Sequence, residues 1–308
     1  MTETSTRAAE HSGMPYGVAA YVAWGLLPIY FKLLPDVMPL EMVASRVLFS
    51  LIVMMVLLAA TGAISEFRRT LLHRQTMITM TASATLIGLN WLVYIWAVNS
   101  GHIVAASLGY FLNPLVNVLL GVVVLKEKLR RAQIIAIFIA ALGVTVMAAS
   151  ALNTLWVSLI LALTFAFYGL IRKTAAVGPR QGLAAETLIL TPLAALYMVW
   201  LTHHGGATFG RDPATSTLLA LSGLITSVPL LLFATAARRM PLSTLGLLQY
   251  LAPTLQFLLG VLLYGEKLSD GQVVSFVLIW AGLLVFTVDS LHAARSARTG
   301  APLPLRTE

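Results

Sequence analysis

The chain has 308 residues, of which 58% are hydrophobic and 10% are charged, and its formal net charge is +8. Soluble globular domains carry about 25% charged residues, so this composition excludes a soluble enzyme or binding module and is typical of an integral membrane protein. Because the chain has no cysteine, disulfides, thiolate metal sites and cysteine nucleophiles are also excluded.

Ten apolar runs are long enough to cross a bilayer as helices, since about 20 apolar residues span the hydrocarbon core. The connections between these runs are short and leave no room for a soluble domain. The sequence therefore predicts an all-α integral membrane protein with ten transmembrane helices. We expect them at residues 14–34, 40–61, 76–98, 103–125, 132–150, 154–171, 183–202, 216–237, 243–264 and 271–290.

The basic residues are distributed unevenly over the connections. With the N-terminus placed in the cytoplasm, most of the 20 Lys and Arg residues lie on that side, and the outer loops hold only Arg211 and Lys267. This is the positive-inside pattern. Both termini are therefore predicted to be cytoplasmic, with polar tails at 1–13 and 291–308. The positive charge indicates orientation in the membrane, and nucleic acid is not an expected partner.

The first two predicted helices carry cations near their outer ends. Trp24, Pro28 and Lys32 recur at helical spacing on one face, and Arg46 lies about two turns into the second helix. Either cation can extend to the headgroups with its charge in water. The alternative is that both attract an anionic or electronegative solute to a pathway.

The third predicted helix contributes Asn90, Trp91 and Tyr94. Asn90 and Tyr94 are four residues apart and share a face. Polar groups in hydrocarbon usually face a protein interior or a water-filled cavity, so both are candidates for a solute site. Trp91 either lines that site or packs between helices.

The fourth predicted helix contains the stretch "GYFLNPLVN", in which Tyr110, Asn113 and Asn117 fall on one stripe with Gly121. A single Asn usually joins helices by a hydrogen bond. Three polar side chains beside Pro114, which frees a backbone carbonyl, favour a cavity wall instead.

Carboxylates are absent from the predicted mid-membrane region. Glu186 comes nearest, about one turn into the seventh predicted helix. It either complements the dipole of that helix N-terminus or takes part in coupling or gating. Glu127 and Glu266 lie at helix ends, where we expect them to cap the fifth and tenth helices.

An internal repeat is present at an offset of 139 residues. "LNPLVNVLLGVVVLKEKLRRAQ" (112–133) aligns without gaps on "LAPTLQFLLGVLLYGEKLSDGQ" (251–272), with ten identities. Each half is thus a five-helix unit, at 14–150 and 154–290, and the odd number of spans inverts the second unit. The loop charges agree, because "KEKLRR" carries +3 and "GEKLSD" carries −1. Two inverted repeats are the organisation expected of a secondary transporter.

The repeat extends the polar stripe to the ninth predicted helix. Tyr110 corresponds to Gln249 and Asn117 to Gln256, so polar side chains recur at both positions. Tyr250 adds a further aromatic side chain. Together with the aromatic and amide residues of the first half, these positions predict a cavity for an amphipathic or aromatic solute.

The stretches "AAYVAWGLLPIYFK", "GLNWLVYIWAVNSGHIVAASLGYFLNPLVNVLLG", "FAFYGLIRK", "STLGLLQYLAPT" and "YGEKL" resemble the RarD-type permeases of the EamA branch of the drug/metabolite transporter superfamily. The resemblance covers residues 14 to 290. It implies a ten-helix carrier in the bacterial inner membrane, from a family named for an association with chloramphenicol sensitivity.

The leading hypothesis is a secondary transporter of a small organic solute, drug or metabolite, working by alternating access. The alternatives are a membrane-embedded lipid-modifying enzyme and a passive channel. An enzyme needs convergent acid, base or metal-binding groups, whereas all six histidines lie in tails or loops. No catalytic residue, metal or cofactor is expected. The expected partners are the solute and the lipid bilayer, and the sequence leaves a homodimer open.

Overall fold

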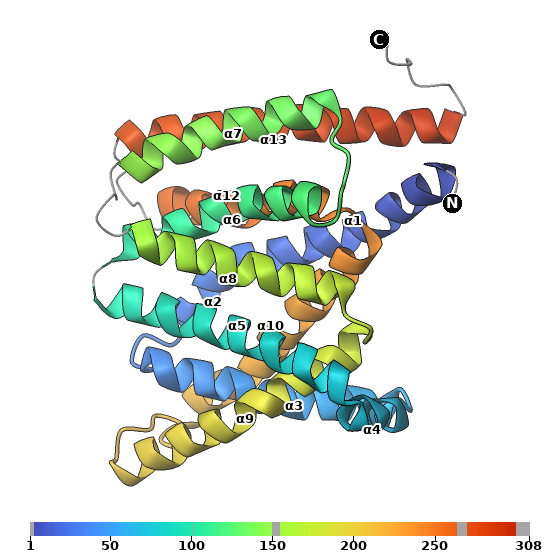
Figure 1. The fold of residues 1–308 in the computed structure, drawn as a ribbon. Helices are drawn as coiled ribbons and strands as arrows, with labels where there is room; N and C mark the ends of the chain where they lie inside the picture. Colours follow the sequence, from blue (N-terminus) through green and yellow to red (C-terminus); the bar gives the residue numbers. More distant parts are fainter. Residues whose placement is uncertain (1–2, 101, 150–154, 264–269, 300–308) are drawn as a thin grey trace.

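The computed structural model describes residues 3–100, 102–149, 155–263 and 270–299, and every regular element among them is helical. The helices form a layered bundle (Figure 1). α7 and α13 lie together along one flank, and α3 packs on α9 at the opposite flank. The helices between them include α6, α8, α5, α1 and α10.

The helices keep the order of the predicted spans. Before residue 150 they are α1 (Glu3–Gly25), α2 (Leu27–Lys32), α3 (Pro39–Ala60), α4 (Ile64–Leu72), α5 (Arg74–Asn99), α6 (Ile103–Val123) and α7 (Arg131–Ala149). After it they are α8 (Leu155–Thr174), α9 (Pro179–His203), α10 (Pro213–Arg239), α11 (Leu242–Gln249), α12 (Leu251–Leu258), a π-helical turn (Leu259–Leu263) and α13 (Asp270–Thr299).

Two of the expected spans are interrupted near prolines. α1 ends at Gly25 and α2 begins at Leu27, next to Pro28. The expected span 243–264 divides at Tyr250, because Pro253 lacks the N–H that would bond the carbonyl of Gln249 in an unbroken helix. From the sequence, Pro28 and Pro253 are expected only to kink their helices, whereas the structure divides both spans into separate helices.

Two helix boundaries and one additional helix differ from the expectation. α1 begins at Glu3 rather than near residue 14, and α13 continues to Thr299 rather than ending near residue 290. The short helix α4 was not expected at all. Its nine residues are too few to span a bilayer, and only Phe67 is buried while Arg68 and Arg69 are exposed.

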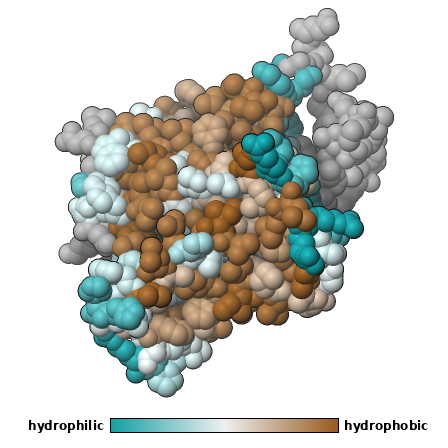
Figure 2. All heavy atoms as spheres, turned by 60° about the horizontal axis from the view of Figure 1, so that its bottom comes forward, coloured by the Kyte–Doolittle hydropathy of each residue, from teal (hydrophilic) through white to brown (hydrophobic). Residues whose placement is uncertain are grey.

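The surface confirms an all-α, multi-pass membrane protein. Eight described helices are long and apolar enough to cross a bilayer, and shorter apolar helices cover Leu108–Val123 and Val273–Asp289. Figure 2 shows a broad apolar surface with hydrophilic residues gathered at its edges. Leu193 and Leu196 of α9 are 70% and 69% exposed, which is the surface expected toward lipid.

The contact between α7 and α13 is reciprocal. A Cβ added to Gly143 would lie 2.8 Å from the carbonyl oxygen of Ser275, and one added to Gly282 would lie 2.7 Å from that of Ala136. Gly143 and Gly282 correspond under the 139-residue offset, and so do Ala136 and Ser275. The two helices therefore approach backbone to backbone through equivalent residues of the two halves.

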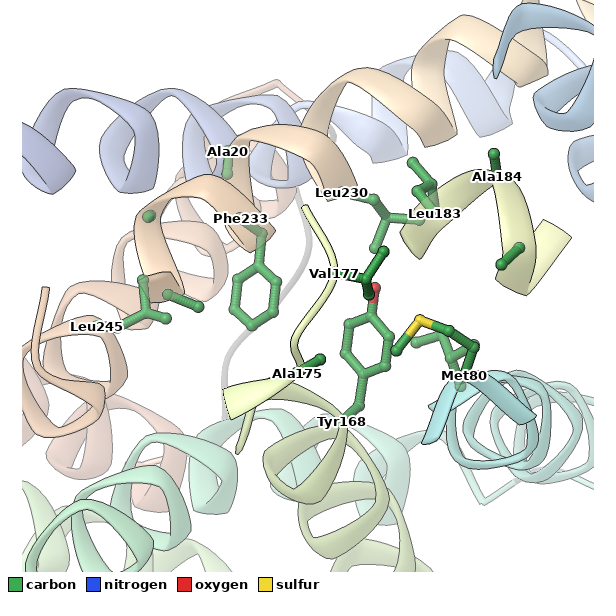
Figure 3. Packing of buried hydrophobic residues seen from close by; sticks show 14 of the residues in the cluster. Ala20, Met80, Tyr168, Ala175, Val177, Leu183, Ala184, Leu230, Phe233 and Leu245 are labelled. Atoms are coloured by element: carbon green, nitrogen blue, oxygen red, sulfur yellow. The ribbon is translucent and has the colours of Figure 1, made fainter. Parts of the chain in front are cut away.

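An aromatic cluster fills the region where α1, α8 and α10 meet. The ring centroids of Trp24 lie 5.8 Å from Phe165 and 5.6 Å from Phe233, and Phe233 stacks 6.0 Å from Tyr168. Figure 3 shows the ring of Tyr168 between Phe233 and Met80. This packing joins the first half of the chain to the second.

Candidate functional site

Arg46 is held in place by residues from two other helices. Its Nε donates a hydrogen bond to Thr226 Oγ1 of α10 at 2.8 Å. Its guanidinium carbon lies 5.1 Å from the ring centroid of Trp91 on α5, a cation–π distance. The side chain is partly buried, and these two contacts hold it in position.

Two phenols complete this environment. The rings of Tyr94 and Tyr110 lie 5.7 Å apart, and both phenols lie in the neighbourhood of Arg46. Tyr30 also lies in this neighbourhood, but its hydroxyl already donates to the carbonyl of Leu218 at 3.0 Å. We call Arg46, Trp91, Tyr94, Tyr110 and Thr226 the arginine cluster.

The arginine cluster brings four of the expected site residues together: Arg46, Trp91, Tyr94 and Tyr110. They come from α3, α5 and α6 and meet near the start of α3 and of α6. Among the described residues, Arg46 takes part in no ion pair. An uncompensated cation in a membrane span is costly and marks a place where an anion would be stabilised.

The expected amides occupy contacts between helices. Asn90 Nδ2 donates to Leu161 O and Thr164 Oγ1, both at 2.9 Å, and Asn113 Nδ2 donates to Ala162 O at 2.9 Å. These bonds tie α5 and α6 to α8. Hydrogen bonds of this kind agree with the alternative in which the amides join helices. A cavity-lining role for these residues stays a prediction.

Asn117 links α6 to α11. Its Nδ2 donates to Asn113 Oδ1 at 2.9 Å and to Gln249 Oε1 at 3.0 Å. Its own Oδ1 is buried without a hydrogen-bond partner among the described residues. The close approach of the two helices depends on Gly246, where an added Cβ would lie 2.8 Å from the Cβ of Asn117.

The remaining expected residues of the first and ninth spans lie in other contacts. Gln256 Nε2 donates to the carbonyl of Trp24 at 3.1 Å, and the Trp24 ring belongs to the aromatic cluster of α1, α8 and α10. Tyr250 donates to the carbonyl of Phe111 at 3.2 Å. Lys32 is exposed at the end of α2.

Glu186 is the centre of a second polar cluster. Its Oε1 accepts from Ser83 Oγ at 2.6 Å and pairs with Arg172 Nη1 at 3.4 Å, while Oε2 accepts from the Tyr168 hydroxyl at 3.4 Å. Arg172 and Glu186 are 1% and 2% exposed. We call Ser83, Tyr168, Arg172 and Glu186 the glutamate cluster.

Arg172 also fixes the connection between α8 and α9. Its Nη2 donates to the carbonyl of Pro179 at 3.0 Å. The adjacent cation Lys173 donates to the carbonyl of Met240 at 2.6 Å, and Arg238 donates to the carbonyls of Ala175 and Val177. Cations therefore tie α8, α9 and α10 together at this end of the bundle.

The two clusters occupy similar places on the corresponding helices α3 and α9, since at the 139-residue offset Arg46 aligns with Ala185, the residue before Glu186. Arg46 follows Pro39 by seven residues and Glu186 follows Pro179 by seven, and each proline begins its helix. α5 contributes one residue to each cluster, Ser83 and Trp91. These two residues are roughly 12 Å apart along the helix axis at 1.5 Å per residue. The clusters thus lie toward opposite ends of the bundle.

The family model and the relatives agree with this architecture. The model described as the EamA-like transporter family matches residues 11–149 and again residues 152–288. The chain belongs to the EamA-like transporter family. Protein RarD from Streptomyces exfoliatus is 43% identical over 290 residues, which cover 94% of this chain and 92% of that protein. An uncharacterized transporter from Pseudomonas aeruginosa is 44% identical over 287 residues, which cover 92% and 95%.

A solved crystal structure shares the fold of this EamA-like transporter. It has a TM-score of 0.71 at 18% identity and covers 91% of this chain and 99% of its own. With the relatives named RarD, these comparisons confirm the predicted resemblance to RarD-type permeases and a role as a membrane transporter. Among the described residues, no group of three or more His, Asp or Glu side chains is placed to hold a metal.

Sequence reasoning missed several residues of the two clusters in this EamA-like transporter. Arg172 is one of the basic residues that the positive-inside pattern assigns to the cytoplasmic side, and its burial in α8 was not predicted. Its spacing of four from Tyr168 in "FAFYGLIRK" was the available signal. Ser83 and Thr226 gave no signal, because single hydroxyl residues in apolar helices commonly bond their own backbone.

Glu127 corrects a further expectation. Its carboxylate accepts from the backbone N–H of Leu242 at 2.6 Å and from that of Ser243 at 2.9 Å. It therefore caps α11 across the bundle rather than the helix that follows it in sequence. The corresponding Glu266 lies outside the described residues.

Proposed function

We propose that this EamA-like transporter is a secondary transporter that moves a small organic solute across the bacterial inner membrane by alternating access. Its ten transmembrane helices form two inverted five-helix repeats, at residues 14–150 and 154–290. Both termini lie in the cytoplasm, with the ends 1–13 and 291–308 on that side. The solute binds between the repeats, and the lipid bilayer surrounds them.

The observation that carries the proposal is that equivalent residues of the two halves make reciprocal contacts with each other. Gly143 meets Ser275 where Gly282 meets Ala136, and the Tyr250 hydroxyl bonds the carbonyl of Phe111, its counterpart at the 139-residue offset. A family domain that matches the chain twice supports the same repeat. Two near-equivalent halves can exchange conformations and open one site to either side.

The contacts between whole helices support the same symmetry. α1 packs on α10 and α12, and their counterparts α8, α5 and α6 pack on one another in the same way. α1 and α8 therefore each sit between a pair of helices of the opposite half. Rocking of one half against the other would move both clusters together.

The two clusters supply the ends of the pathway. With both termini in the cytoplasm, as the positive-inside pattern favours, the arginine cluster lies toward the outside and the glutamate cluster toward the cytoplasm. In this conformation the glutamate cluster is buried and charge-paired, while the arginine cluster is partly exposed and has no ion pair with any described residue. These features support a conformation closed toward the cytoplasm.

The proposal is tested by solute flux into proteoliposomes that contain the purified full-length chain. Labelled aromatic and amphipathic solutes are offered with and without a pH gradient, and empty liposomes correct for leakage. We expect saturable flux of at least one solute, and we expect Arg46→Met to abolish it. Modification of a lipid without flux of any solute would contradict the proposal, and so would flux that never saturates.

A further inference from the structure

The guanidinium of Arg46 has unused hydrogen-bonding capacity. A guanidinium carries five N–H donors in a planar fork. The Nε–H is used by Thr226, and the contact with Trp91 is to the ring face. Among the described residues, the two terminal nitrogens have no hydrogen-bond acceptor. Those nitrogens form the edge that binds a carboxylate through two parallel hydrogen bonds.

The charge of Arg46 is also uncompensated by the described part of the chain. The ion pairs there join Arg130 to Asp289, Arg172 to Glu186 and Lys173 to Glu127. The nearest acidic residue along α3, Glu41, accepts hydrogen bonds from the backbone N–H groups of Thr208 and Phe209. An anionic solute would therefore bring the missing negative charge.

The rings around Arg46 are suited to a flat apolar group. Trp91 lies against the guanidinium, and Tyr94 and Tyr110 meet at 5.7 Å with their planes tilted by 61°. Among the described residues, neither phenol hydroxyl has a hydrogen-bond partner, in contrast to Tyr30. Both hydroxyls are free to bond an oxygen of a solute whose ring packs beside theirs.

The same surroundings disfavour an ammonium group. No described carboxylate pairs with the cluster, and Arg46 itself would repel a second cation. A zwitterion would gain favourable binding free energy from its carboxylate at Arg46. Repulsion between its ammonium group and Arg46 would cancel part of that gain. A cation would gain nothing from the arginine edge.

We propose that the arginine cluster binds an aromatic monocarboxylate without an ammonium group, its carboxylate on the terminal nitrogens of Arg46 and its ring beside Tyr94 and Tyr110. This inference rests on the proposed transport function and names the class of solute for it. Trp91 and Thr226 position the guanidinium, and the phenols bind the solute.

A matched series of three ligands tests the inference. 3-(4-Hydroxyphenyl)propionate, tyrosine and tyramine share one ring and differ in carrying a negative charge, both charges or a positive charge. Their binding to the full-length chain in lipid nanodiscs is measured by titration calorimetry, with empty nanodiscs as the blank. We expect the propionate to bind at least about tenfold more tightly than tyrosine, and tyramine to show no saturable binding.

Variants of the cluster separate charge from geometry. Arg46→Gln should weaken propionate binding roughly 10- to 100-fold, and Arg46→Lys should recover only part of it because an ammonium lacks the planar fork. Tyr110→Phe should weaken it about threefold to tenfold. The control is Arg211→Gln, an exposed cation in the loop contacted by Glu41, which should leave binding unchanged. Thermal unfolding curves confirm that each variant is folded.

Three results would overturn the inference: no propionate binding, equal or tighter binding of tyrosine or tyramine, or equal propionate binding by Arg46→Gln and the parent chain. If Arg46→Gln fails to fold, Arg46→Lys and Tyr110→Phe decide the outcome on the same measurements. None of these results removes the proposed transport function if another solute shows saturable flux in proteoliposomes. Absence of flux for every solute would instead contradict the transport proposal.

Discussion

The arginine cluster and the glutamate cluster lie on corresponding helices of the two halves, α3 and α9, but are built in opposite ways. Glu186 is neutralised by Arg172, bonded by Ser83 and nearly inaccessible, whereas Arg46 has a hydroxyl, an indole face and two phenols around it. One site is completed by the chain itself. The other lacks a counter-charge among the described residues, and in the proposed account an anionic solute supplies it. This difference would distinguish a closed end of the pathway from a binding end.

The largest expected effect follows from removing one partner of the buried ion pair. Arg172→Met should lower the free energy of unfolding by about 3–5 kcal/mol, because Glu186 would remain buried without compensation. Adding Glu186→Leu to that variant should recover most of the loss. Denaturant unfolding of the purified chain in detergent measures both.

The matched change at the other cluster should behave differently. Arg46→Met should alter the free energy of unfolding by less than about 1 kcal/mol. The loss of one hydrogen bond and one cation–π contact is offset because the variant also removes a cation that has no described carboxylate partner. Equal losses for Arg46→Met and Arg172→Met would show that the two clusters do not differ as described.

The hydroxyl partners sharpen the comparison at smaller magnitude. Ser83→Ala should cost about 1.5–3 kcal/mol, because its 2.6 Å hydrogen bond goes to a buried carboxylate. Thr226→Val should cost only about 0.5–1.5 kcal/mol, since the guanidinium it bonds retains access to water. The same unfolding assay applies, with the exposed Thr217→Val as the control. A greater loss for Thr226→Val than for Ser83→Ala would reverse the assignment.

The comparison also requires that the two halves be related by the repeat, so that equivalent residues make equivalent contacts between α7 and α13. Gly143→Ala and Gly282→Ala should each cost about 1–3 kcal/mol, because each new methyl group would press on a carbonyl of the facing helix. Gly271→Ala, where nothing lies within 4 Å of an added Cβ, should cause no loss. Thermal unfolding of the three variants gives the test. A marked inequality between Gly143→Ala and Gly282→Ala would show that the contact is not symmetric.

Much of the helical framework could be predicted from apolar runs, because a backbone in hydrocarbon must satisfy its own hydrogen bonds. The repeat at 139 residues pointed to the glycines that meet between α7 and α13. Partners across helices could not be predicted. Nothing in the sequence places Arg46 of α3 against Trp91 of α5, or Glu127 against the start of α11.

The main error of the sequence-based prediction concerned a charged residue near a helix end. Arg172 fits the positive-inside pattern, and that pattern does not distinguish a cation in the headgroups from one folded against a carboxylate. The short helix α4 was missed for a different reason, since its nine residues fall below the length of a span. The polar stripe of α6 was visible, but its hydrogen bonds to α8 and α11 depend on the packing.

The central claim is that the two clusters open alternately to opposite sides, and labelling of single cysteines tests it most directly because the chain has none of its own. Tyr94→Cys and Ser83→Cys are exposed to a membrane-impermeant thiol reagent in right-side-out and inside-out vesicles. The account predicts that position 94 reacts from the outside while position 83 is protected. Adding Glu186→Gln should raise labelling of position 83 from the cytoplasmic side and lower that of position 94 from the outside. Reaction of both positions from the same side, unaffected by Glu186→Gln, would contradict it.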